Sequence, residues 1–326
     1  MVAYTGIQGQ NILIVSSDPA NPVEGQIWYN STSNLLKGYQ YVATNAWASG
    51  GTYPVSKQFL GSLGIETAAL AYGGSFPYIA TTALYNGTSW TNNPTGLNTA
   101  RDRLESGGTQ TAGLGFGGYV GGVGNQTASE SWNGSTWTNT PSLNTARRSF
   151  GGCGTQTTAL AFGGIATAAT AVTESWNGSS WTTLPATMNT GRGQLQGNGT
   201  QTAALAFGGL IPPRTAATES WNGSSWTSVN SMNTARGYLS GAGTQTATLG
   251  FGGYALPGNT RTAATESWNG TSWTNTTSLP ATNSAPAGAG TQTSALSIAG
   301  NGAAGYLNTT NEWSGSQLAV KTITVS

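Results

Sequence analysis

The residues that could support chemistry are few in this chain, and most of them recur at regular intervals. The sequence has no histidine, one cysteine, 11 basic and 10 acidic residues. A basic residue opens five copies of a repeated stretch, at Lys57, Arg101, Arg147, Arg192 and Arg236, and Asn283 takes its place in a sixth. In a second repeated stretch, a glutamate stands one or two residues before the first tryptophan, at Glu130, Glu174, Glu219, Glu266 and Glu312. Guanidinium groups bind carboxylates and sulfates through paired hydrogen bonds, so the arginines form either a cationic ring for an acidic ligand or internal pairs with the glutamates; we favour internal pairs.

This inventory excludes most enzyme chemistry. Without histidine there is no imidazole base, no histidine triad and no histidine metal ligand, and one cysteine cannot build a zinc or iron–sulfur site. Glycoside hydrolysis needs two carboxylates across a cleft. The acids that lie outside the repeats are Asp18, Glu24, Glu66, Asp102 and Glu105, and nothing in their spacing indicates that two of them form a catalytic pair. We therefore predict a protein that is not an enzyme, with no catalytic residue, no metal and no cofactor.

Charge and hydropathy exclude two classes of partner. The formal net charge is +1 and no basic run occurs, so the chain lacks the positive footprint of a nucleic-acid-binding protein. Its apolar stretches are far shorter than a membrane span, and the first residues lack the pattern of a conventional signal peptide. We expect no nucleic-acid partner and no membrane insertion.

The chain repeats itself with a period of about 45 residues. The phrase QTAALAFGG, or a variant of it, ends at Gly74, Gly118, Gly164, Gly209, Gly253 and Gly300. The phrase TESWNGSSWT, or a variant, follows each time, with its first aromatic residue at Tyr85, Trp132, Trp176, Trp221, Trp268 and Trp313. Six copies of one structural unit are indicated.

Each copy predicts four short antiparallel strands. Apolar residues alternate with small or polar ones, which is typical of strands. Asn177-Gly178 between two aromatic segments predicts a hairpin with a type I′ turn, in which Trp176 and Trp181 lie on paired strands. A four-stranded sheet of this length is a β-propeller blade, which buries its faces only by packing against neighbouring blades. We predict an all-β propeller whose tryptophans pack mostly between blades.

From about Lys57 to the C-terminus the chain resembles the kelch-repeat propellers. In one copy the residues that carry the resemblance are Arg147, the pair Gly163-Gly164, Trp176 and Trp181. A tryptophan stands where kelch repeats usually have tyrosine, and the loop between the two aromatics is tighter. The resemblance implies a propeller fold, places the basic positions near one mouth of the central channel, and says little about activity.

Residues 1–50 leave two blade counts open. Trp47 stands ten residues before Lys57, as Trp137 stands ten before Arg147, so its segment is expected to be a fourth strand. Three strand-like runs precede it. We favour a divergent seventh blade in residues 1–50, with residues 51–326 forming six blades and Leu318 standing where the last copy would have its second tryptophan. The alternative has six blades, with the Trp47 strand completing the C-terminal copy and the rest of the N-terminus forming a small attachment segment.

The loops between the two repeated phrases differ most from copy to copy. Recognition is commonly carried by such loops on a repeated scaffold. They supply Tyr78, Tyr119, Arg214, Tyr254 and Arg261, whose rings and guanidinium groups suit sugars or proteins. With the ring of Arg101, Arg147, Arg192 and Arg236, these are the predicted ligand-binding residues.

The stretch SSDPANPVEGQIWYNSTSNLLKGY resembles a segment of tail-fibre and other virion proteins of bacteriophages, especially marine ones, which also carry repeats similar to those of this chain. The resemblance implies a non-enzymatic virion or tail-associated propeller that binds host-surface glycan or protein, or acts as a scaffold, and that meets other virion proteins through residues 1–50. A secreted bacterial lectin or adhesin, and more remotely a polysaccharide-active enzyme, are the alternatives.

Overall fold

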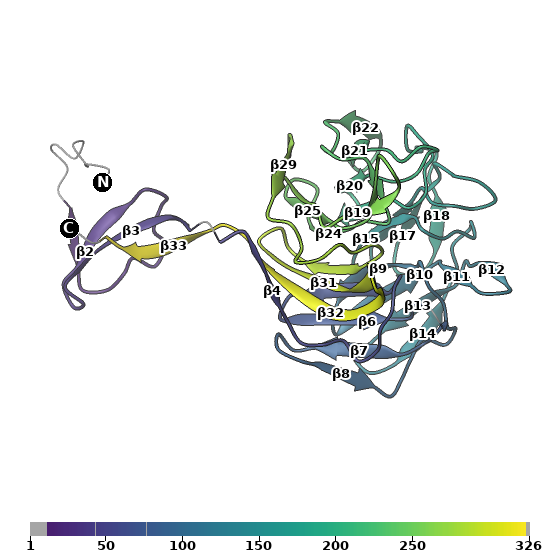
Figure 1. Cartoon of the computed structure of the whole chain (residues 1–326), viewed down its shortest axis with the longest axis horizontal. Coiled ribbons are helices and arrows are strands. Elements are labelled where there is room, and N and C mark those ends of the chain that lie inside the picture. Colours follow the sequence, from purple (N-terminus) through teal and green to yellow (C-terminus); the bar gives the residue numbers. More distant parts are fainter. Residues whose placement is uncertain (1–11, 43, 76, 324–326) are drawn as a thin grey trace. The chain divides into compact units, whose positions relative to one another are not determined.

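The chain divides into two compact units. The computed structural model describes residues 12–42, 44–75 and 77–323, and the secondary structure of these residues is entirely β. A propeller unit comprises Ala46–Ser314, and a terminal unit comprises Met1–Asn45 with Gly315–Ser326 (Figure 1). Among the described residues no helix is long and apolar enough to cross a membrane.

The propeller unit contains six four-stranded antiparallel sheets, each called a blade here and numbered in chain order. Blade 1 has β5 (Gly61–Ile65), β6 (Ala68–Tyr72), β7 (Thr82–Tyr85) and β8 (Trp90–Asn93). Blade 2 has β9 (Glu105–Thr109), β10 (Ala112–Phe116), β13 (Ser129–Trp132) and β14 (Trp137–Thr140). Blade 3 has β15 (Gly151–Gly154), β16 (Ala159–Phe162), β17 (Thr173–Trp176) and β18 (Trp181–Thr183).

The remaining blades follow the same order, except at the end of the sixth. Blade 4 has β19 (Gln196–Gly199), β20 (Ala204–Phe207), β21 (Thr218–Trp221) and β22 (Trp226–Val229). Blade 5 has β24 (Ser240–Gly243), β25 (Thr248–Phe251), β28 (Thr265–Trp268) and β29 (Trp273–Thr276). Blade 6 has β30 (Ala287–Gly290), β31 (Ser294–Gly302), β32 (Gly305–Ser314) and, from the start of the chain, β4 (Ala46–Ser49).

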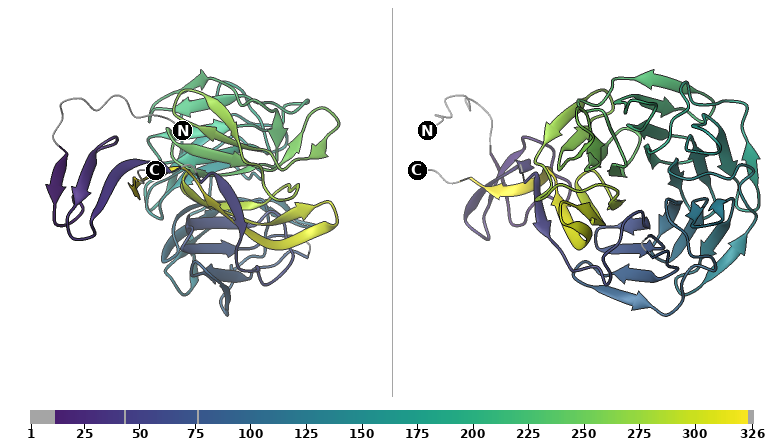
Figure 2. Two further views of the ribbon diagram at one scale, coloured as in Figure 1. Left: turned by 60° about the vertical axis from the view of Figure 1, so that its left-hand side comes forward. Right: turned by 45° about the vertical axis from the view of Figure 1, so that its right-hand side comes forward.

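The first strands of successive blades contact one another in a closed cycle. β5 contacts β9, and the contacts continue through β15, β19, β24 and β30 back to β5. Figure 2 shows the resulting ring in its right-hand view. Repeated four-stranded antiparallel sheets arranged in this way fit a β-propeller repeat protein.

Tryptophans join each blade to the one before it, as predicted from the repeat. The indole nitrogen of the tryptophan that opens the last strand of a blade, or of Trp47 in β4, donates to a hydroxyl on the third strand of the preceding blade, over 2.8–3.2 Å. Trp181, for example, donates to Ser129 and packs against Phe116 with ring centroids 4.9 Å apart. In the same way Trp90 of blade 1 donates to Thr310 of blade 6. The pattern is therefore continuous across the junction between the last blade and the first.

The repeated hairpin forms as predicted, but its turn differs. Trp176 pairs with Trp181 across β17 and β18, which confirms the hairpin. Of the two residues expected to have positive φ, Gly178 does (93°) and Asn177 does not. The Asn177 side chain instead accepts hydrogen bonds from the backbone amides of Ser179 and Ser180, both 2.9 Å. Four residues separate the paired tryptophans, so the turn is a longer loop closed by the asparagine side chain.

The glycine pair that ends each second strand allows a close approach between strands. Gly163 and Gly164 have φ values of 65° and 102°, a conformation that glycine adopts without strain. A Cβ atom on Gly164 would lie 2.5 Å from Cβ of Phe150. This position therefore requires glycine for both its backbone conformation and its lack of a side chain.

The terminal unit is a separate four-stranded sheet made from both ends of the chain. Its strands, in order across the sheet, are β1 (Leu13–Val15), β2 (Ile27–Asn30), β3 (Leu35–Val42) and β33 (Gln317–Thr322). The Asp18 carboxylate accepts hydrogen bonds from Trp28 (3.1 Å) and Asn30 (2.8 Å) and pairs with Lys37 (2.8 Å). These bonds, that of Lys37 first, lower the pKa of Asp18 to about 2.

This pairing corrects the expectation that residues 1–50 form one blade. The Trp47 strand β4 belongs to the sheet of β30, β31 and β32, whereas β1, β2 and β3 belong to another sheet. Leu318, expected at the second tryptophan position of the last copy, lies on β33, which pairs with β3. The strand order is that of the alternative considered from the sequence. Pairing depends on which edge is free in space, and β32 offers its free edge to β4.

Candidate ligand-binding site

The repeated arginines are structural, in contrast to their predicted role in ligand binding. The side chains of Arg101, Arg147, Arg192 and Arg236 are 0% exposed. Each pairs with the glutamate of its own copy, at Glu130, Glu174, Glu219 and Glu266 respectively. Because no guanidinium atom of these four reaches the surface, we remove them from the candidate site. The ion pairs are those that we favoured from the sequence.

One copy shows what the buried pair does. Arg147 donates to Glu174 (2.7 Å) and to the carbonyl oxygens of Val172 (2.8 Å) and Gly163 (3.2 Å). Glu174 in turn accepts from the backbone amides of Asn144 (2.7 Å) and Thr145 (3.2 Å). Burial lowers the pKa of Arg147 to about 10, against the opposing effect of Glu174. The pair thus fixes the segment that leads into the first strand of its blade.

A ring at one mouth of the channel is formed by six residues, one from each copy. Each lies two positions after the repeated basic residue, or after Asn283 in the sixth copy. We call this set the mouth ring: Phe59, Arg103, Ser149, Gln194, Tyr238 and Ala285. Each amide donates to the carbonyl oxygen of the preceding member, and Phe59 donates to Ala285, so six hydrogen bonds of 2.7–3.2 Å close a circle. All six residues have φ between 51° and 58°. That conformation is strained for non-glycine residues and is found where the surroundings impose it, often at functional sites.

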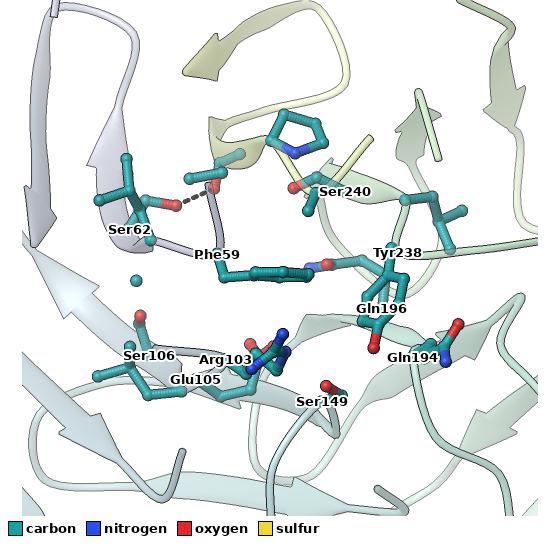
Figure 3. A pocket seen from close by; sticks show the side chains of 18 of the residues that line it. Phe59, Ser62, Arg103, Glu105, Ser106, Ser149, Gln194, Gln196, Tyr238 and Ser240 are labelled. Atoms are coloured by element: carbon teal, nitrogen blue, oxygen red, sulfur yellow. Dashed lines mark hydrogen bonds between the residues drawn. The ribbon is translucent and has the colours of Figure 1, made fainter. Parts of the chain in front are cut away.

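Beneath the mouth ring lies a narrow polar channel. Its outer section has a volume of about 80 Å³ and its inner section about 130 Å³. The lining includes Ser62, Glu105 and Gln196 (Figure 3), and burial raises the pKa of Glu105 well above its ordinary value. Ligand pockets typically have volumes of about 300–1,000 Å³. Both sections of the channel are smaller than this range. The face around the mouth is therefore the candidate site for a larger ligand.

Around the mouth, tyrosine rings lie next to arginine side chains in two clusters. In the first, the guanidinium carbons of Arg148 and Arg103 lie 4.6 and 5.7 Å from the ring centroid of Tyr119. The Tyr78 ring centroid lies 6.2 Å from that of Tyr119. Arg148 also donates to the side chain of Asn125 (2.7 Å). The short hairpin of β11 (Tyr119–Val120) and β12 (Gly124–Asn125) holds this cluster.

In the second cluster, Arg214 and Arg261 lie 5.2 and 5.4 Å from the ring centroid of Tyr254. Tyr254 and Arg261 are cross-strand neighbours on β26 (Tyr254–Ala255) and β27 (Thr260–Arg261), which extend from β23 (Arg236–Gly237). Arg214 comes from the corresponding loop of blade 4. Two neighbouring blades therefore supply this cluster.

Phe59 connects the two clusters across the mouth. Its ring lies 4.2 Å from the guanidinium carbon of Arg103 and 4.9 Å from the ring centroid of Tyr238, and Figure 3 shows these three side chains converging over the channel. Arg214 lies beside Gly237, the neighbour of Tyr238. We call the connected surface the mouth face: Phe59, Tyr78, Arg103, Tyr119, Arg148, Arg214, Tyr238, Tyr254 and Arg261.

The mouth face collects the arginines of the propeller unit that do not pair with the repeated glutamates. These are Arg103, Arg148, Arg214 and Arg261. Asp102 pairs with Arg103 (3.0 Å), and burial raises the pKa of Asp102 despite that partner. The face therefore carries a net positive charge next to aromatic rings.

Sequence reasoning found five members of the mouth face, Tyr78, Tyr119, Arg214, Tyr254 and Arg261, and missed the other four. A usable signal was present: Phe59, Arg103 and Tyr238 occupy a position that differs in every copy, although it lies between a recurring basic residue and a recurring apolar residue. Variation inside an otherwise repeated segment indicates a role outside the blade. Among the described residues, no group of three or more Asp, Glu or Cys could hold a metal ion.

No protein-family model matches this chain, and no curated protein matches it. The candidate function consequently rests on the geometry of the mouth face and on the resemblances found in the sequence.

Proposed function

We propose that this chain is a non-enzymatic, phage-virion-associated binding protein whose kelch-like propeller has six blades and binds a host-surface glycan through the mouth face. The observation that carries the proposal is the gathering of four arginines and four aromatic neighbours, Phe59, Tyr119, Tyr238 and Tyr254, around one mouth of the channel. Sugars stack on flat aromatic rings, and guanidinium groups hold carboxylates or sulfates in paired hydrogen bonds.

Two repeating features support six blades. The indole–hydroxyl hydrogen bonds include both Trp47 to Thr265 and Trp90 to Thr310, which leaves no gap in the cycle of blades. The backbone circle of the mouth ring likewise passes from Ala285 to Phe59. The kelch-like resemblance rests on the sequence, and its positions serve the blade here: Arg147 forms a buried ion pair, and Trp176 and Trp181 pack in a core between blades.

The virion assignment is supported by the sequence resemblance of a stretch in the terminal unit. The stretch that resembles phage virion proteins forms the β2–β3 hairpin, fixed by the Asp18 bonds. Because this unit is a separate sheet, it offers a surface for other virion proteins that is distinct from the mouth face. A secreted lectin or adhesin would use the same mouth face, and adjacent tail or capsid genes in the genome distinguish the two.

The test is binding of the intact protein to an array of neutral and acidic glycans. The double variant Tyr119→Ser/Arg148→Gln should lose at least about tenfold in affinity, or about 1.4 kcal/mol. Binding should also weaken as salt rises, because exposed charges are screened over about 10 Å at 0.1 M. Lys321→Gln, which removes an exposed positive charge from the terminal unit, is the matched control. Glycan binding that survives the double variant at unchanged melting temperature overturns the proposal.

A further inference from the structure

The Arg214–Tyr254–Arg261 cluster carries positive charge without a partner. Neither guanidinium has an ion pair or a hydrogen bond among the described residues. The Nε atoms of both arginines are buried from solvent and unbonded. A buried donor without an acceptor is unfavourable. The Nε atoms of Arg101, Arg103, Arg147 and Arg236 are also unbonded, but each of those arginines pairs with a carboxylate, which Arg214 and Arg261 do not.

The two arginines also share one aromatic neighbour. Arg214 and Arg261 approach the same ring, at 5.2 and 5.4 Å from its centroid, and both are partly exposed. Burial lowers the pKa of Arg214, which means that its surroundings disfavour the charged form. A bound anion would reverse this effect and supply acceptors for the orphaned donors.

The first cluster differs in this respect. Arg103 is paired with Asp102, and Arg148 donates to Asn125. The Nε atom of Arg103 is unbonded, but both arginines of this cluster have a polar partner within the protein. The two clusters are therefore chemically unequal, although each has two arginines near one tyrosine ring.

We propose that Arg214 and Arg261 together hold an oxyanion, the sulfate or carboxylate group of an acidic ligand, beside the ring of Tyr254. This inference rests on the proposed function for the identity of the whole ligand, but the oxyanion subsite itself is a property of these three residues. Each guanidinium can donate two parallel hydrogen bonds to an oxyanion, and the adjoining aromatic ring keeps water from competing on one side.

The experiment follows the arginine Nε–Hε resonances of the intact protein during titration with sodium sulfate, at constant ionic strength maintained with sodium chloride. Melting temperature alone is unsuitable because sulfate stabilises proteins non-specifically by exclusion. We expect a saturable shift of the Arg214 and Arg261 signals. Arg214→Gln and Arg261→Gln should each weaken sulfate binding at least about tenfold, and Lys321→Gln, which removes one exposed charge from the terminal unit, should not.

Two further measurements identify the kind of anion that the subsite prefers and control for loss of folding. Sodium acetate in place of sulfate distinguishes a carboxylate preference from a sulfate preference, and either outcome supports the oxyanion subsite. The conservative variant Arg214→Lys keeps the charge and controls for loss of folding. The absence of a saturable shift in the wild-type protein with both anions overturns the inference, as does an equal effect of Lys321→Gln.

The outcomes separate this inference from the proposed function. Sulfate or acetate binding at the arginine pair, with no binding on the glycan array, supports the subsite and rejects the glycan-binding function. Glycan binding that is unchanged in Arg214→Gln and Arg261→Gln, with no anion shift, supports the function and rejects the subsite.

Discussion

Trp47 and Trp313 come from opposite ends of the sequence, yet they lie opposite each other on neighbouring strands with their ring centroids 5.3 Å apart. The equivalent pair within one copy, Trp176 and Trp181, has a centroid distance of 5.5 Å. Trp47 also packs against Phe251 of blade 5, at 5.2 Å. The first ordered strand of the propeller unit therefore supplies the second tryptophan of the last blade, and the two ends of the unit depend on each other.

Two truncations test this dependence. A fragment of residues 46–314 keeps β4 and should unfold cooperatively at nearly the melting temperature of the propeller in the full chain. A fragment of residues 50–314 lacks β4, exposes the edge of β32 and loses the Trp47 contacts, so it should melt much lower or aggregate. Differential scanning calorimetry makes the comparison. Similar melting of the two fragments would show that β4 is dispensable for the ring.

Removal of one inter-blade tryptophan should be costly. Trp176 is 2% exposed, packs in a core with Phe116 and Phe150, and donates to the carbonyl oxygen of Gln156 (3.0 Å). Trp176→Ala leaves a cavity and should destabilise the protein by about 3–5 kcal/mol. Urea unfolding measures the change, with Thr182→Ala, exposed on the same hairpin, as a control expected within about 0.5 kcal/mol. A loss below about 1 kcal/mol would contradict a shared core between blades.

Arg147 should matter for stability and not for binding. Arg147→Met leaves Glu174 buried without its cation, which should cost about 3–5 kcal/mol in the free energy of unfolding. The double variant Arg147→Met/Glu174→Leu removes the orphaned charge and should be less destabilised than the sum of the two single variants. Glycan binding per folded molecule should not change. A selective loss of binding at unchanged stability would return Arg147 to the ligand site.

Glu105 should make the propeller less stable as pH rises. Burial in the channel raises its pKa in the folded state, whereas its pKa in the unfolded chain is about 4.3. Between these values the folded state binds more protons than the unfolded state, so stability falls with increasing pH. Glu105→Gln should be more stable than the wild type at pH 8, and the difference should disappear below about pH 4. A pH-independent difference between the two proteins would contradict this account.

Much of the fold could be predicted from the sequence because the signals act within one copy. Alternation along QTAALAFGG and the four-residue gap between Trp176 and Trp181 specify strands and a hairpin whose partners are near in the chain. The repetition of those residues then requires that blades pack against one another, since a single sheet cannot bury both faces. The ion pair of Arg147 with Glu174 was foreseeable for the same reason, because both residues recur with the blade.

The candidate site and the end of the ring depended on the tertiary structure. Arg147 and Arg148 are adjacent in the sequence, but the first is fully buried in its blade and the second lies partly exposed against Tyr119 from the blade before. Adjacent residues in an extended chain point to opposite sides, and only the packing of blades decides which side is the interior. In the same way, β4 is a strand by its sequence, but its partner is set by the free edge of β32. That edge becomes available to β4 only when the packed sheets bring the two ends of the propeller unit together.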